Sequence, residues 1–129
     1  MSEYSYLFDG LSRLASYIVF NSKAKKSKRI DAIVAIQEAV NSTRIHINEN
    51  CQKEYQPSSE SSKLWLIAFE KCQLLSLNDV EIKQCITKAR FWSDPEEWKK
   101  YESAMELIPS LIEMENLADT MLEKLNSNY

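Results

Sequence analysis

The scarcity of glycine is the feature that most limits what this chain can fold into. Gly10 is the single glycine among 129 residues, where average usage would give roughly nine. Glycine supplies the positive φ angles of tight hairpin turns and lets backbone approach a bound phosphate closely. A chain almost without it is poorly suited to a many-stranded sheet and well suited to long helices joined by polar loops. It also cannot form a dinucleotide-binding glycine fingerprint or a P-loop.

Apolar residues recur at helical spacing through most of the sequence, and strand-like alternation is absent. The sequence therefore predicts an all-α fold. We expect a compact single-domain bundle over residues 1–129, with five or six helices, antiparallel neighbours and no sheet. The expected helices cover about residues 3–21, 25–48, 59–75, 78–92, 95–108 and 111–125.

The apolar stripe of each expected helix is its predicted core face. In the second and the last of these helices the stripe follows a 3-4-3-4 rhythm, which is typical of left-handed bundles. In the second helix the stripe residues are Ile33, Ile36, Val40, Thr43 and Ile47, in the third Leu64, Trp65, Ala68, Phe69, Cys72 and Leu75, and in the last Leu111, Met114, Ala118, Met121 and Leu125.

Three features interrupt the helical pattern. A polar, serine-rich stretch containing Pro57 predicts a loop over about residues 49–60. A helix break is expected at about residues 92–95, because the residue before Pro95 is disfavoured in a helix. Pro109 predicts a kink or a break between the last two helices.

The stretch FWSDPEEW, residues 91–98, combines a helix start with two tryptophans. Asp94 suits the N-cap and Pro95 the first helical position, while Ser93 offers an alternative register. Trp92 and Trp98 flank this cap, as in a hydrophobic staple. Together with Tyr101, one turn further along, they are also our candidate partner-binding surface, because tryptophan and tyrosine are enriched in binding hot spots.

Charge is unevenly distributed along the chain. The net charge is −3, yet residues 94–129 hold nine acidic and three basic side chains, a net charge of −6. A run of cations between the first two expected helices is usually a solvated surface, but it could serve as an electrostatic patch for phosphate or an acidic partner. The run consists of Lys23, Lys25, Lys26, Lys28 and Arg29.

Few residues suit catalysis or metal binding. His46 is the lone histidine, and in a helix it points about 200° away from Arg44. Cys51, Cys72 and Cys85 form no CxxC pair, which favours reduced thiols over a zinc site. We therefore predict no catalytic residue, no metal and no cofactor.

The sequence also shows no signal-peptide pattern and no apolar run near the ~20 residues of a membrane span, so we expect a cytoplasmic protein without membrane contact.

Three functional hypotheses follow from these patterns. The first is a non-catalytic protein–protein interaction module, such as an adaptor, a regulator or a subunit of a larger assembly, with self-association as its simplest form. The second is a nucleic-acid-associated helical protein that uses the basic run at residues 23–29. The third is a helical nuclease-like enzyme centred on His46.

Replacing both Asp94 and Pro95 by alanine should destabilise the protein by about 1 kcal/mol, because the helix start loses its cap. Thermal unfolding of the double variant measures this cost. An unchanged melting temperature would mean that no helix begins at this position.

Overall fold

The all-α fold class is confirmed in the part of the chain that the structure describes. This computed structural model describes residues 12–13, 16–19, 24–51, 58–75 and 108–128. Nearly all of these residues are helical, and none of them lies in a strand.

Three long helices make up most of the described structure. They are α2 (Lys26–Asn50), α3 (Ser59–Leu75) and α5 (Ile108–Asn128). With the helical residues at 12–13 and 16–19, the described residues contain four helices, not the five or six predicted. The difference arises because the helix expected over 78–92, and most of the one expected over 95–108, lie outside the described residues. The FWSDPEEW stretch lies outside them as well.

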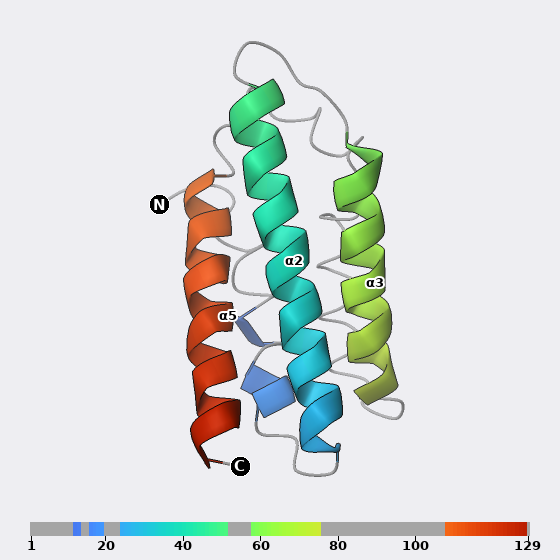
Figure 1. Cartoon of the computed structure of the whole chain (residues 1–129), viewed down its shortest axis with the longest axis vertical. Helices are drawn as coiled ribbons and strands as arrows, with labels where there is room; N and C mark the ends of the chain where they lie inside the picture. Colours follow the sequence, from blue (N-terminus) through green and yellow to red (C-terminus); the bar gives the residue numbers. More distant parts are fainter. Residues whose placement is uncertain (1–11, 14–15, 20–23, 52–57, 76–107, 129) are drawn as a thin grey trace.

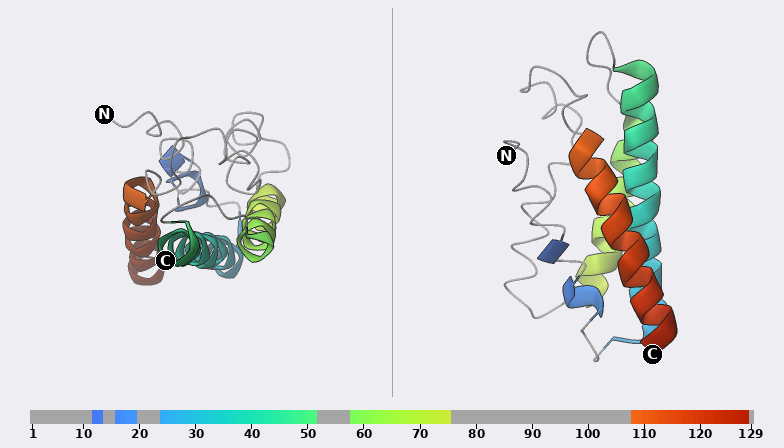
Figure 2. Two further views of the ribbon diagram at one scale, coloured as in Figure 1. Left: turned by 90° about the horizontal axis from the view of Figure 1, so that it is seen from above. Right: turned by 90° about the vertical axis from the view of Figure 1, so that its left-hand side faces the viewer.

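Helix α2 is the central element, with α3 on one side and α5 on the other (Figure 1). Both neighbours run antiparallel to α2, as the sequence predicted. Seen from above, the three helices form one layer, and residues 16–19 lie on one side of it (Figure 2). Ile18 and Val19 are buried there, within the same core cluster as the three long helices.

The predicted stripes form the core. Every stripe residue of α2 and α5 is buried, as are Trp65, Ala68, Phe69 and Cys72 of α3, while Leu64 and Leu75 are half-buried against them. Helix α2 also buries three alanines, Ala32, Ala35 and Ala39. Small side chains on a central helix allow its neighbours to approach closely, because little side-chain volume separates the backbones.

The start of α3 has a side-chain cap. The hydroxyl of Ser58 accepts a hydrogen bond of 3.1 Å from the backbone N–H of Ser61, which is the N-cap to N3 bond of a standard helix start. The Ser62 N–H donates to the carbonyl of Ser58 at 3.1 Å and begins the helical hydrogen-bond series. The cap explains why the polar loop ends and the helix begins at Ser59.

The other two helices begin differently. Helix α2 has Lys25 at its N-cap, in an extended conformation and without a side-chain capping bond. Helix α5 begins at Ile108 with Pro109 as its second residue. The first turn of a helix tolerates proline, because the N–H that proline lacks has no helical acceptor there.

A buried hydrogen bond joins α2 to α3. The indole N–H of Trp65, a side chain with 0% exposure, donates to the hydroxyl of Thr43 at 2.7 Å. The Thr43 hydroxyl donates in turn to the carbonyl of Ala39 at 2.8 Å. The ring of Phe69 stacks on Trp65 with a centroid separation of 5.7 Å. Nearer the surface, the hydroxyls of Ser42 and Ser61 lie 2.9 Å apart across the same two helices.

Polar contacts also join α2 to α5. Arg44 Nε and Glu115 Oε2 form an ion pair of 2.9 Å, and both side chains are partly exposed. Gln37 Nε2 donates to Asp119 Oδ1 at 2.6 Å. These contacts lie on the opposite side of α2 from Ser42, so they set the position of α5 independently of α3.

Replacing Thr43 by valine should destabilise the protein by about 1–3 kcal/mol, because the buried indole N–H of Trp65 loses its acceptor. Urea unfolding measures the cost. The control is the same substitution in a Trp65→Phe background, where no N–H remains to be satisfied and the cost should be much smaller. Equal costs in the two backgrounds would contradict the proposed role of the bond.

Candidate functional site

The residues of the predicted basic patch occupy different environments. Lys25 and Lys28 are exposed and Lys26 is half-exposed, whereas Lys23 lies outside the described residues. Arg29 has only 5% of its surface exposed, and its Nη1 donates to the carbonyl of Val19 at 2.8 Å. Arg29 therefore fixes the segment before α2 against the core and does not belong to the surface patch. The aromatic candidates Trp92, Trp98 and Tyr101 lie outside the described residues.

A hollow of about 440 Å³ lies where the start of α2 meets the end of α3. Three lysines, one aspartate and three apolar residues line it, and we call it the basic end. The lining residues are Ala24, Lys25, Lys28, Asp31, Lys71, Leu74 and Leu75. The fold thus adds a third lysine, Lys71, to two members of the run, although it is more than 40 residues away in the sequence.

A second hollow, of about 420 Å³, lies at the other end of the same two helices. It contains three glutamates and no lysine or arginine, and we call it the acidic end. The lining residues are Glu38, Asn41, Ser42, Ile45, His46, Glu49, Asn50, Ser58 and Glu60.

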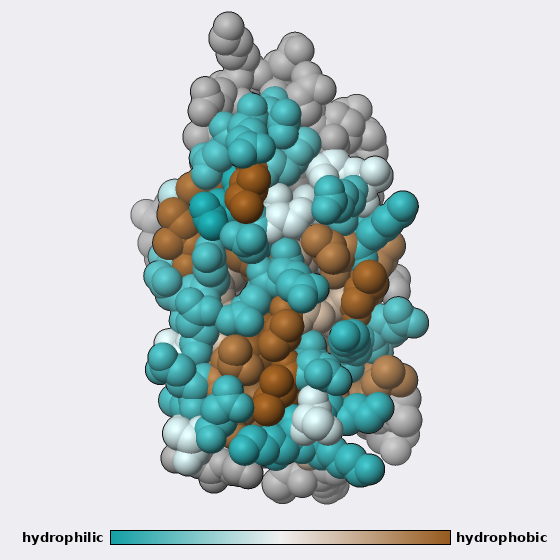
Figure 3. Space-filling model, viewed as in Figure 1, coloured by the Kyte–Doolittle hydropathy of each residue, from teal (hydrophilic) through white to brown (hydrophobic). Residues whose placement is uncertain are grey.

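Both hollows belong to the seam between α2 and α3, which we call the α2–α3 groove. Ile67 lies between them on α3, because it is seven residues after Glu60 and four before Lys71, and residues at these spacings share a helix face. Ile67, Ile45 of the acidic end and Leu74 of the basic end are 44%, 40% and 63% exposed. On the face shown in Figure 3, the largest hydrophobic area lies between the lower parts of α2 and α5, and smaller hydrophobic areas lie over α3.

The charged residues of the groove are arranged against the helix dipole and also against the repulsion between like charges. Helix α2 carries lysines and no acidic residue in its first turn, and Glu49 and no basic residue in its last, which is the reverse of what the helix dipole favours. The antiparallel pairing then places Lys71 of α3 beside the lysines, and Glu60 beside the glutamates. Like charges thus predominate in each lining: Asp31 is the one acidic residue beside the three lysines, and no lysine or arginine lines the acidic end. On α3 itself, the exposed residues Lys63 and Glu70 share the face of Ile67 and add one charge of the opposite sign near each end.

Arg44 and His46 point to different sides of α2, as the sequence predicted. Arg44 pairs with Glu115 of α5, whereas His46 lines the acidic end. The imidazole Nδ1 of His46 lies 3.3 Å from the side-chain nitrogen of Asn50. Among the described residues, no group of three or more His, Cys, Asp or Glu side chains could hold a metal ion.

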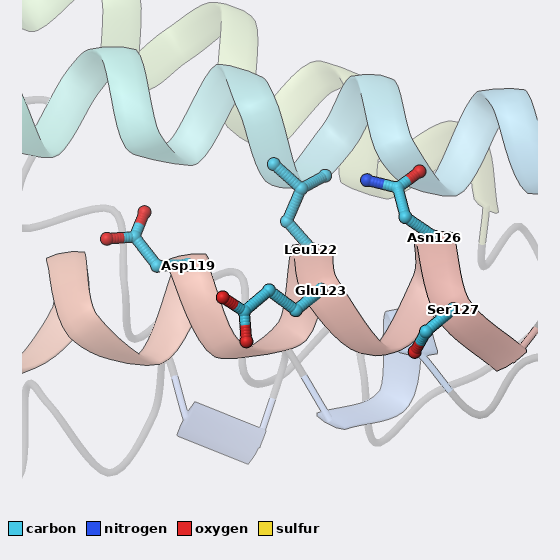
Figure 4. Close-up of a pocket in the computed structure, with 5 residues that line it drawn as sticks. All are labelled: Asp119, Leu122, Glu123, Asn126 and Ser127. Atoms are coloured by element: carbon cyan, nitrogen blue, oxygen red, sulfur yellow. The ribbon is translucent and has the colours of Figure 1, made fainter.

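A third hollow, of about 700 Å³, lies along the second half of α5. Its lining is Asp119, Leu122, Glu123, Asn126 and Ser127, all from one helix, and Leu122 and Asn126 point toward α2 (Figure 4). Asp119 already accepts a hydrogen bond from Gln37. The lining offers no basic group and no nucleophile paired with a base, so it suggests no chemistry.

The two described cysteines are buried thiols. Cys51 and Cys72 are 3% and 1% exposed, and burial raises the pKa of the Cys72 thiol to about 12. A thiol with so high a pKa is a poor nucleophile at neutral pH. This agrees with the sequence prediction that Cys72 is a core residue; Cys85 lies outside the described residues.

No helix in the described part of the chain has the length and apolar character needed to cross a membrane. Compared with known proteins, the chain matches no family model, no curated protein and no solved structure.

Sequence reasoning missed the groove residues on α3. Ile67 and Leu74 lie outside the core stripe and are seven residues apart, which places them on one exposed face. That spacing was a readable signal of a second apolar surface. The clustering of Lys71 with Lys25 and Lys28 could not be predicted from the sequence, because it depends on the register between two helices.

The native protein should lose stability as the pH rises above 9. The Cys72 thiol has an ordinary pKa of 9.0 in the unfolded chain and about 12 in the folded protein, so only the unfolded state releases this proton between those values. The slope should be on the order of 1 kcal/mol per pH unit. Urea unfolding at pH 8, 9 and 10 should show this slope of unfolding free energy in the native protein. The Cys72→Ala variant should lack the contribution of the thiol to the slope. Identical slopes would contradict the assignment.

Proposed function

We propose that this protein is a non-catalytic protein–protein interaction module: a small adaptor, regulator or subunit of a larger assembly. The observation that supports the proposal is the row of exposed apolar side chains, Ile45, Ile67 and Leu74, along the α2–α3 groove. The proposal places the protein in the cytoplasm, where buried thiols such as those of Cys51 and Cys72 stay reduced.

The groove has the composition of an interface. Protein interfaces combine an apolar centre with a polar rim, and their specificity comes largely from charge complementarity. Here Ile67 lines neither hollow but lies between them along α3, and charged side chains line both hollows. Covering the three apolar side chains would be favourable by about 25 cal/mol for each Å² of apolar surface removed from water.

The aromatic residues Trp92, Trp98 and Tyr101 remain a second candidate surface, predicted from sequence alone. These three residues lie outside the described part of the chain, so the structure does not place them relative to the groove. The two surfaces are separable by mutation, because they belong to different segments of the chain.

One observation favours the alternative of nucleic-acid association: Lys71 joins Lys25 and Lys28 at the basic end. Three lysines could neutralise only a few phosphates, and such binding would weaken steeply with salt. The glutamates of the acidic end would repel a nucleic acid that extended along the groove. They would equally repel phosphate from His46, which lies among them, so the nuclease hypothesis has less support than either of the others.

Replacing Ile67 by glutamate should abolish partner binding while leaving the fold intact, because the side chain is exposed and lies at the middle of the groove. The matched control is Leu66→Glu. Leu66 is the neighbouring residue, with a similar exposure of 49%, but it points about 100° around the helix from Ile67. Tagged native, Ile67→Glu and Leu66→Glu chains are recovered from their native cells at low and at high salt, with and without nuclease, and the bound material is identified.

We expect the native chain and Leu66→Glu to recover a bound protein in stoichiometric amount. We expect Ile67→Glu to recover none. Circular dichroism confirms that both variants are folded. Equal recovery with both variants would exclude the groove as the binding surface. Material lost on nuclease treatment would favour the nucleic-acid alternative instead.

A further inference from the structure

We infer that the partner seated on the α2–α3 groove is a second copy of this chain, bound antiparallel across a two-fold axis. In this arrangement the basic end of each copy faces the acidic end of the other. The inference rests on the proposed function, since it identifies the occupant of the same groove.

The segregation of charge along the groove supports this choice. A surface that is positive at one end and negative at the other is complementary to itself after a two-fold rotation, which is the requirement for an isologous dimer. Within one copy, the like charges gathered at each end repel one another. A second copy in the antiparallel orientation would bring Glu49 and Glu60 of each copy to the lysines of the other, and it would offset the repulsion among the lysines and between these two glutamates.

The register of the groove agrees with a two-fold axis through its middle. On α3, Lys71 and Glu60 lie about 17 Å apart along the helix axis, and the midpoint between them falls within about two residues of Ile67. When Lys71 of one copy faces Glu60 of the other, the two Ile67 side chains meet near the axis. The exposed apolar residue at the centre is thereby covered by its own counterpart.

The same register predicts a contact on α2 that distinguishes a second copy of this chain from a different, basic partner protein. The midpoint between Lys28 and Glu49 lies at about residue 38, so Glu38 of each copy falls near the axis and faces a like charge. Glu38 therefore opposes the dimer, whereas Glu49 and Glu60 favour it. A different, basic partner protein would be favoured by all three glutamates.

The size of the groove indicates a weak dimer. The 17 residues of α3 span about 26 Å, and two packed helices present a face about 20 Å wide. Two such faces would bury on the order of 1,000 Å², which is at the lower limit for specific interfaces. We therefore expect dissociation in the micromolar range and a clear dependence on protein concentration.

Sedimentation equilibrium of the full chain over a dilution series, in low salt and in 0.5 M sodium chloride, tests the inference. A monomer–dimer equilibrium should appear, and salt should weaken it by roughly tenfold through screening of the end-to-end charge pairs. Ile67→Glu should remove the dimer, and Leu66→Glu should retain it. Glu38→Gln should tighten it by several-fold.

A charge exchange tests the antiparallel orientation. Lys28→Glu with Lys71→Glu makes both ends acidic, and Glu49→Lys with Glu60→Lys makes both ends basic. All four positions are exposed, and circular dichroism confirms folding. Each double variant alone should be monomeric, and an equimolar mixture should form a one-to-one heterodimer. If a double variant fails to fold, the Glu38→Gln comparison tests the same register.

Two outcomes would overturn the inference. One is a native chain that stays monomeric to millimolar concentration, and the other is a mixture of the two double variants that does not associate. Neither outcome would overturn the proposed function if a different protein is captured by the native chain and lost with Ile67→Glu. If no protein is captured and no dimer forms, both proposals fail together.

Discussion

The hydrogen bond between Trp65 and Thr43 is the constraint on which the rest of the described structure depends. A fully buried indole requires an acceptor for its N–H, and in this core the acceptor is a hydroxyl on the neighbouring helix. The bond fixes the register of α3 against α2, and the contact between Ser42 and Ser61 repeats that register nearer the surface. Because the register is fixed, Lys71 lies beside the lysines at the start of α2 and Glu60 lies near Glu49 at its end. The polarity of the groove is therefore a consequence of how one tryptophan is buried.

The helices and their buried faces could be predicted from sequence, because burial on a helix has a local period. The stripe from Ile33 to Ile47 identified the core face of α2 before any neighbour was known, and the serine-rich loop located the start of α3. The burial of Arg29 could not be predicted in this way. A cation within a basic run looks solvated, and its burial depends on partners that the fold brings near, such as the carbonyl of Val19. The candidate groove was missed for the same reason, since its two walls come from helices whose register the sequence does not state.

The two sides of α2 are held by different kinds of contact. Toward α3 the hydrogen bond between Trp65 and Thr43 is buried, where a missing partner costs most. Toward α5 the pair Arg44–Glu115 is partly exposed, and such pairs contribute at most about 1 kcal/mol. The attachment of α5 therefore comes mainly from its apolar stripe, Leu111 to Leu125, which is buried throughout. The ion pair and the bond from Gln37 to Asp119 select the orientation of α5 more than they stabilise it.

The central position of α2 also has a consequence for the order of events during synthesis. Helix α3 begins nine residues after the end of α2, whereas α5 ends at Asn128, more than 50 residues after the end of α3. At about 5–20 residues per second, a ribosome needs several seconds to make that interval, while neighbouring helices pair in milliseconds or less. We therefore expect the nascent chain to hold a paired α2 and α3 for seconds, with the side of α2 that α5 later covers still in contact with water. During that interval the apolar residues of α2 that α5 later covers are a surface that a chaperone could bind.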